Sequence, residues 1–218
     1  MNDFDENVDP ARAAADADLV QQLWTTWAAR GEGLTAAQWA GPTRLAGWTV
    51  RDLYAHAAPV PDELVMFLST RAAGPPAVST GAAILRAFNR PDGVAHVAAA
   101  DIADAAASTA ARISTADLVT RFRSATEPAF VARLRAIPAG QVVQHPVLGT
   151  VTVAALVEVS VMEHTVHLLD LIDAVGGPPA PADAVRRALD IVAAVPDPER
   201  LLETLTGRRP GTALPVVR

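Results

Sequence analysis

Residues 152–177 read TVAALVEVSVMEHTVHLLDLIDAVGG, a long and mainly apolar run between a capping residue and two glycines. Thr152 can accept hydrogen bonds from the free N–H groups that begin a helix, and a glycine pair is common where helices end. The run therefore predicts one long helix. Apart from one threonine, the polar groups of residues 161–171 are Glu163, His164, His167 and Asp170. They need an explanation, because burying a carboxylate without a partner is costly.

The composition of the whole chain favours helices. Half of the 218 residues are hydrophobic, but only 5% are aromatic and alanine is abundant, which is typical of close-packed helices rather than of a sandwich or barrel. The length suits one sizeable core. We therefore expect an all-α fold in a single domain over residues 1–218, with residues 1–8 flexible and residues 207–218 as an extended tail.

Helix boundaries can be predicted along the rest of the chain. Asp9 and Pro10 begin an amphipathic helix that lasts to Gly31, and Thr49 with Asp52 caps a helix through residues 50–58. Further helical stretches are expected near residues 35–39, 82–88, 94–111, 116–136, 182–195 and 197–205.

Two segments are less regular. Pro59 and Pro61 should end or kink the helix before them, so residues 62–74 either continue the same rod after a bend or form a separate helix. Residues 137–153 lack helical periodicity and could hold a short extended piece. About four long helices with short accessory ones account for the chain, which predicts a four-helix bundle.

Composition and charge argue against several functional classes. The 18 basic residues are all arginine, they are scattered, and the net charge is −6, which argues against nucleic-acid binding. The start is acidic and no apolar run approaches the ~20 residues of a membrane span, so we expect a cytoplasmic protein without a membrane partner. There is no cysteine, so any thiol in a reaction must come from a cofactor or substrate. The apolar helices make a homodimer possible.

Glu163 and His167 are four residues apart, so a helix presents both side chains to the same point. A metal ion is one of the few partners that compensates a carboxylate and a neutral imidazole together. Otherwise, Glu163 meets an arginine and His167 is an ordinary core histidine. A metal site needs a third ligand, and His56 is the candidate because it lies beside the apolar face of its own helix. His96 and His145 have no partner at ligand spacing and are expected to be structural.

Three protein ligands would leave coordination positions open, as in a catalytic site. The Glu-x-x-x-His pattern occurs once, so it fits neither the di-iron bundles nor the His-Glu-x-x-His proteases. Asp52 either orients an imidazole or caps its helix, and Asp170 could orient His167. Trp48 is either a pocket wall or a core anchor. His164 could replace one of the ligands, but we expect it at the surface or at an interface.

Three segments resemble the DinB/YfiT-like superfamily, namely PTRLAGWTVRDLYAHAA (42–58), VLGTVTVAALVEVSVMEHTVHLLDL (147–171) and LLETLTGRRPGTALPVVR (201–218). Within it, the chain is similar to the actinobacterial branch related to the N-terminal domain of mycothiol-dependent maleylpyruvate isomerase. The most specific parts of the resemblance are GWTVRDLYAH (47–56) and the Glu-x-x-x-His pair followed by Asp-Leu.

The resemblance implies a DinB-like four-helix bundle that binds a divalent ion, commonly zinc or nickel, through His56, Glu163 and His167. It also implies a transferase or isomerase that uses a low-molecular-weight thiol such as mycothiol, with the ion lowering the thiol pKa so that the thiolate attacks a small electrophile. A chain without cysteine fits a thiol that arrives as a cosubstrate. Two alternatives stay open, which are a non-catalytic metal-binding or sensing bundle and a metal-free dimerisation module.

Overall fold

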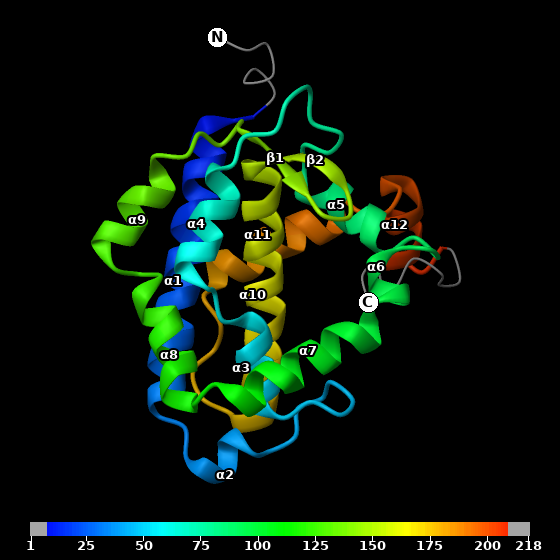
Figure 1. The fold of residues 1–218 in the computed structure, drawn as a ribbon. Helices are drawn as coiled ribbons and strands as arrows, with labels where there is room; N and C mark the ends of the chain where they lie inside the picture. Colours follow the sequence, from blue (N-terminus) through cyan, green and yellow to red (C-terminus); the bar gives the residue numbers. More distant parts are fainter. Residues whose placement is uncertain (1–7, 209–218) are drawn as a thin grey trace.

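The computed structural model describes residues 8–208, so residues 1–7 of the expected flexible start and residues 209–218 of the expected tail lie outside the described residues. The centre of the fold is a pair of long helices, α1 (Pro10–Glu32) and α10 (Val153–Val175), which lie side by side (Figure 1). α11 (Ala182–Ala193) also packs on α10. The expected all-α bundle with short accessory helices is confirmed. Within the described part of the chain, no helix combines the length and apolarity needed to cross a membrane.

α1 is held by its cap and by aromatic packing. The Asp9 carboxylate accepts hydrogen bonds from two N–H groups of the first turn, as expected. Trp27 is fully buried, and its ring stacks on Phe122 of α8 (Thr115–Ser124) with 5.4 Å between ring centroids. Gly31 lets the two helices approach closely, because a Cβ there would lie 2.5 Å from Cγ2 of Val119.

The segment after α1 forms α2 (Ala36–Trp39), α3 (Val50–Ala57) and α4 (Pro61–Ser69). Thr49 and Asp52 form a capping box at the start of α3, in which each side chain bonds the backbone N–H of the other. Ala58 precedes a proline and is extended (φ −68°, ψ 123°), so α3 ends before it. α4 is therefore a separate helix and does not continue α3.

Two stretches expected as single helices are each divided in two, so the prediction of their continuity is wrong. Residues 94–111 form α6 (Val94–Val97) and α7 (Ala99–Arg112), with Ala98 outside helical geometry at φ −116° and ψ 8°. Residues 116–136 form α8 and α9 (Pro128–Arg135), because the proline disfavours helical geometry in the residue before it, which has a ψ of 137°. The remaining short helices lie where expected, at Gly81–Phe88 (α5) and Pro198–Leu205 (α12).

The expected extended piece is an antiparallel hairpin of β1 (Val142–His145) and β2 (Gly149–Thr152). Val143 pairs with Val151, and both are fully buried in a small second core that includes Leu68 of α4. Thr152 ends β2 and caps α10, its hydroxyl accepting from the N–H of Ala155 at 3.2 Å. The hairpin thus determines where α10 begins.

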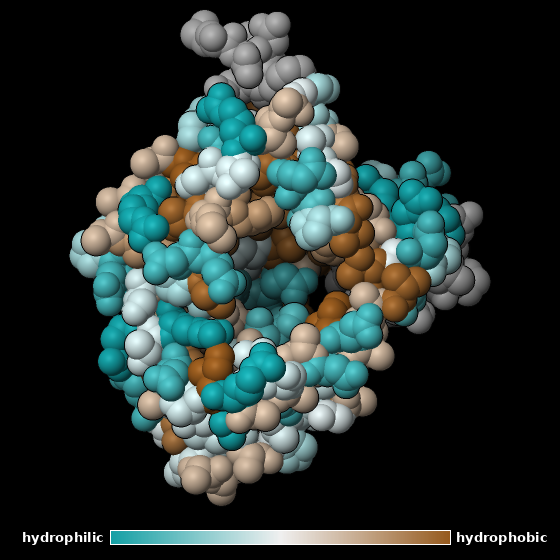
Figure 2. All heavy atoms as spheres, in the orientation of Figure 1, coloured by the Kyte–Doolittle hydropathy of each residue, from teal (hydrophilic) through white to brown (hydrophobic). Residues whose placement is uncertain are grey.

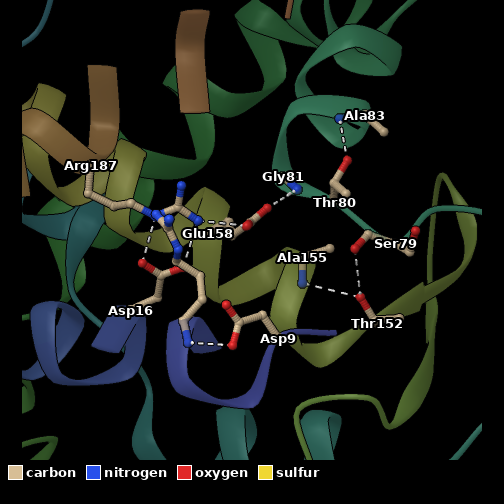
Figure 3. A network of polar contacts seen from close by, with 11 residues as sticks. Asp9, Asp16, Ser79, Thr80, Gly81, Ala83, Thr152, Ala155, Glu158 and Arg187 are labelled. Carbon is tan, nitrogen blue, oxygen red and sulfur yellow. Dashed lines mark hydrogen bonds and ion pairs between the residues drawn. The ribbon is translucent and has the colours of Figure 1, made fainter. Parts of the chain in front are cut away.

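A partly buried ion network ties α10 to three other helices (Figure 3). Arg187 of α11 donates to both carboxylate oxygens of Asp16 of α1, at 2.7 and 2.8 Å, and to Glu158 of α10 at 2.7 Å. The other oxygen of Glu158 accepts from the N–H of Gly81 at the start of α5, at 2.5 Å. Asp16 is only 3% exposed, so its charge depends on the arginine. These bonds hold α10 in one rotation about its axis.

Candidate metal centre

Three donor groups from two helices meet where α3 packs on α10. His56 lies in the last turn of α3, and Glu163 and His167 are one turn apart on α10. One donor atom from each residue lies within 4.8 Å of the others. The His56 and His167 ring centroids are 5.1 Å apart, and Nε2 of His167 is 3.3 Å from a carboxylate oxygen of Glu163. The structure brings together the three residues that the sequence singled out.

Asp170 orients the His167 ring. Oδ2 of Asp170 lies 2.9 Å from Nδ1 of His167, and its Oδ1 accepts a hydrogen bond from Nε of Arg44 at 2.6 Å. The Asp170 side chain is 3% exposed, so its carboxylate is held between these two partners. Nδ1 of His167 donates to Asp170, which leaves Nε2 turned toward Glu163 and His56. Sequence reasoning gave Arg44 no role, because the contact joins residues 126 positions apart.

The three donor side chains differ in charge at neutral pH. Burial, followed by the neighbouring charge of His167, lowers the pKa of His56 to about 4, so His56 is neutral. Burial also disfavours the charged form of His167, but hydrogen bonds to Asp170 and Glu163 outweigh it and raise the pKa of His167 to about 9. Burial opposes the charge of Glu163 as well, yet the hydrogen bond with His167 holds the pKa of Glu163 below its usual value.

His164 lies inside the fold, not at the surface or interface position expected. Nε1 of Trp24 can only donate, and it lies 3.0 Å from Nε2 of His164, which must accept. The ring proton then sits on Nδ1, 2.7 Å from the carbonyl oxygen of Ser160. Burial lowers the pKa of His164, in keeping with this neutral form. Both ring nitrogens are therefore engaged by the protein itself.

Asp52 takes the capping role, whereas Trp48 both packs against the core and lines the cavity. The Asp52 carboxylate bonds the hydroxyl and N–H of Thr49 at 2.6 and 2.9 Å, so it caps α3 rather than orienting His56. Trp48 packs edge-on against His56, with 5.2 Å between centroids, and it lines the cavity as a pocket wall. The other two histidines lie outside the cluster. His145 accepts N–H bonds in the hairpin turn, and His96 is exposed on α6.

The cluster opens into a cavity of about 1240 Å³. Figure 2 shows it as a hollow in this face, with hydrophilic residues deep inside and hydrophobic ones along the edge near α5 to α7. Through it solvent reaches His56 and Glu163, and the Glu163 side chain is 43% exposed although protein atoms surround it. A small molecule entering the cavity could therefore contact the donor groups directly.

Comparison with known proteins identifies a family for this chain. Residues 20–172 match the family described as the mycothiol maleylpyruvate isomerase N-terminal domain. No curated protein and no solved structure matches the chain. The matched residues include most of α1, all of α3 and nearly all of α10, and so all three donor groups. The expected DinB/YfiT-like relationship is confirmed, and the chain belongs to the mycothiol maleylpyruvate isomerase N-terminal domain family.

Proposed function

We propose that this protein is a divalent-metal-dependent enzyme that joins a low-molecular-weight thiol of the mycothiol type to a small electrophile, or uses that thiol to isomerise it. The observation that carries the proposal is the meeting of His56, Glu163 and His167 at the wall of a large cavity. Family membership supports the link to a mycothiol-type thiol. The absence of cysteine fits a thiol that comes from outside the chain.

The donor set suits a divalent ion. Two imidazole nitrogens and one carboxylate form a ligand set known from catalytic zinc sites, and imidazole also suits nickel. His56 and His167 would offer nitrogen and Glu163 oxygen. When bound, such an ion would lower the pKa of a thiol that reaches it, and so supply a thiolate near neutral pH.

The surrounding residues would position the donors. Asp170, itself held by Arg44, keeps Nε2 of His167 aimed at the cluster. Trp48 covers one edge of His56 and limits the directions from which a thiol could approach. The cavity beyond these side chains would give the electrophile room beside the donor groups.

The two alternatives explain less of the structure. A non-catalytic metal-binding bundle does not need a cavity of about 1240 Å³ beside its ion. A metal-free dimerisation module does not need three convergent donors on the cavity wall. Zinc or nickel as the ion, mycothiol as the thiol, a homodimer and a cytoplasmic location stay predictions from the sequence.

Elemental analysis of the purified protein tests the proposal first. His56→Ala and His167→Ala are compared with the wild type and with the matched variant His96→Ala, which alters an exposed histidine outside the cluster. We expect near one equivalent of zinc or nickel in the wild type and in His96→Ala, and little in the other two variants when circular dichroism shows them folded. A wild type that takes up no metal after reconstitution would refute the metal-dependent reading.

The thiol step is tested on the metal-loaded protein. We expect consumption of mycothiol together with a small electrophile, and loss of that activity in the two cluster variants but not in His96→Ala. A metal-loaded protein that consumes no thiol with any of a panel of electrophiles would favour the non-catalytic alternative.

A further inference from the structure

One face of α10 forms a wall of the cavity along most of the helix. The lining residues of α10 include a row three or four positions apart, namely Val153, Leu156, Ser160, Glu163, His167 and Asp170, together with neighbours such as Ala154 and Val157. From Val153 to Val159 the lining residues of α10 are all apolar, and the donor groups follow from Glu163 onward. The cavity therefore has two chemically different ends.

The apolar end is long and has aliphatic and aromatic walls. The ten residue steps from Val153 to Glu163 span about 15 Å along the helix. Phe67 of α4 and Phe88 of α5 line other sides of the cavity, and α1 contributes small residues such as Ala17, which leave the space open. At about 1240 Å³ the cavity exceeds the ~300–1,000 Å³ of common small-molecule sites.

The charges on the wall do not suit a small polyanion. Among the described residues that line the cavity outside the centre, the charged ones are Asp18 and Arg135, and they pair with each other at 2.6 Å. A dicarboxylate bound in the apolar half would lose hydration without gaining a cation in return. An apolar ligand would instead gain from burial at every carbon.

We propose that the cavity binds an elongated, mainly apolar electrophile, with an aliphatic or aryl-alkyl tail along the first half of α10 and one polar reactive group at His56, Glu163 and His167. An extended chain advances about 1.2 Å per bond, since three backbone bonds span 3.3–3.6 Å, so the 15 Å length holds a tail of about twelve atoms. The position of the reactive group rests on the proposed function, whereas the tail site rests on the cavity alone.

Binding of straight-chain 1-alkanols to the full chain tests the tail site. Trp24 and Trp48 line the cavity, so a change in the intensity or wavelength of intrinsic tryptophan fluorescence reports occupancy. From four carbons upward, the Kd obtained from the change in emission should fall about fourfold per added methylene and stop falling near twelve carbons. Maleate, as a small dianion, should not bind in the same concentration range. A Kd that is independent of chain length, or maleate binding tighter than 1-decanol, would overturn the inference.

A filled cavity provides the second test. Ala154→Phe places a ring on the apolar wall, and Ala107→Phe makes the same change on an exposed part of α7 outside the lining. We expect the Kd of Ala154→Phe to stop falling several carbons earlier, and that of Ala107→Phe to follow the wild type. Equal chain-length limits in all three folded proteins would contradict the inference. If Ala154→Phe does not fold, the wild-type series decides.

Metal analysis of the same samples separates the two proposals. Ala154 is nine residues from Glu163, about 13 Å along α10, so Ala154→Phe should keep the metal content of the wild type. Alkanol binding by a protein that takes up no metal would uphold the tail site and refute the proposed function. Metal uptake without alkanol binding would refute the tail site and uphold the metal centre, and the thiol assay would then decide the proposed function.

Discussion

Asp170→Asn separates orientation from charge at the candidate centre. Asparagine keeps an oxygen that can accept from Nδ1 of His167, but it removes the negative charge that Arg44 also contacts. Loss of such a partner of a ligating histidine weakens metal binding by about 10- to 100-fold. In the wild type, His167 has a pKa of about 9 and must lose its proton to offer Nε2 to an ion. At pH 7, which is two pH units below this pKa, removing the proton costs about 2.7 kcal/mol, at about 1.36 kcal/mol per unit.

Asp170→Asn has two opposite effects on metal affinity. Loss of the partner of His167 weakens binding, whereas a lower pKa of His167 reduces the cost of removing its proton, and the pH dependence of binding separates the two effects. Metal affinity of the wild type should rise about tenfold per unit from pH 6 to 9, because one proton competes with the ion at His167. His56, with a pKa of about 4, is neutral over this range and adds no further dependence. Loss of the Asp170 charge lowers the pKa of His167, so the variant's affinity should level off at a lower pH. The full weakening should appear near pH 9, and a smaller one at pH 7.

Competition with a chelator of known affinity measures this profile. Asp173→Asn is the matched control, because Asp173 lies one turn further along α10 and is exposed. We expect it to follow the wild type at every pH. Parallel pH profiles for the wild type and Asp170→Asn, or equal weakening in Asp173→Asn, would refute the role assigned to Asp170.

Three further predictions concern stability. Arg187→Met removes the cation that two carboxylates share and should lower the free energy of unfolding in urea by about 3–5 kcal/mol, whereas Arg186→Met, in an exposed pair, should cost under about 1 kcal/mol. Gly31→Ala should lower the melting temperature because its Cβ would clash across the α1–α8 contact, whereas Gly33→Ala, whose nearest atom is 3.7 Å away, should not lower it. Zinc or nickel at a free concentration of 100 times Kd should raise the free energy of unfolding by about 2.7 kcal/mol. Calorimetry with and without a chelator measures this difference. His56→Ala should show no such increase.

The helix boundaries predicted well are those that a single residue determines. Thr49 and Thr152 cap the helices that follow them, because a hydroxyl at that position bonds the free N–H groups whatever the rest of the fold does. The break at Pro128 had a readable local signal, since proline restricts the residue before it. The break at Ala98 had none, because residues 94–111 contain neither glycine nor proline.

The candidate site was predictable only in part. Glu163 and His167 could be paired from their spacing, since residues four apart share a helix face in any fold. His56 stood out through its apolar surroundings and through the family resemblance. The position of His164 could not be predicted, because α10 is apolar on most sides and its sequence does not say which side meets Trp24.

The sequence by itself determined the helical class, most helix ends and the alignment of Glu163 with His167, because these depend on local hydrogen bonding and on the 3.6-residue period. Only the tertiary structure decided that α3 delivers His56 to this pair, that Arg44 and Asp170 hold His167, and that a long apolar cavity stays open beside them. These features depend on packing between helices far apart along the chain, and helical periodicity carries no information about which faces meet.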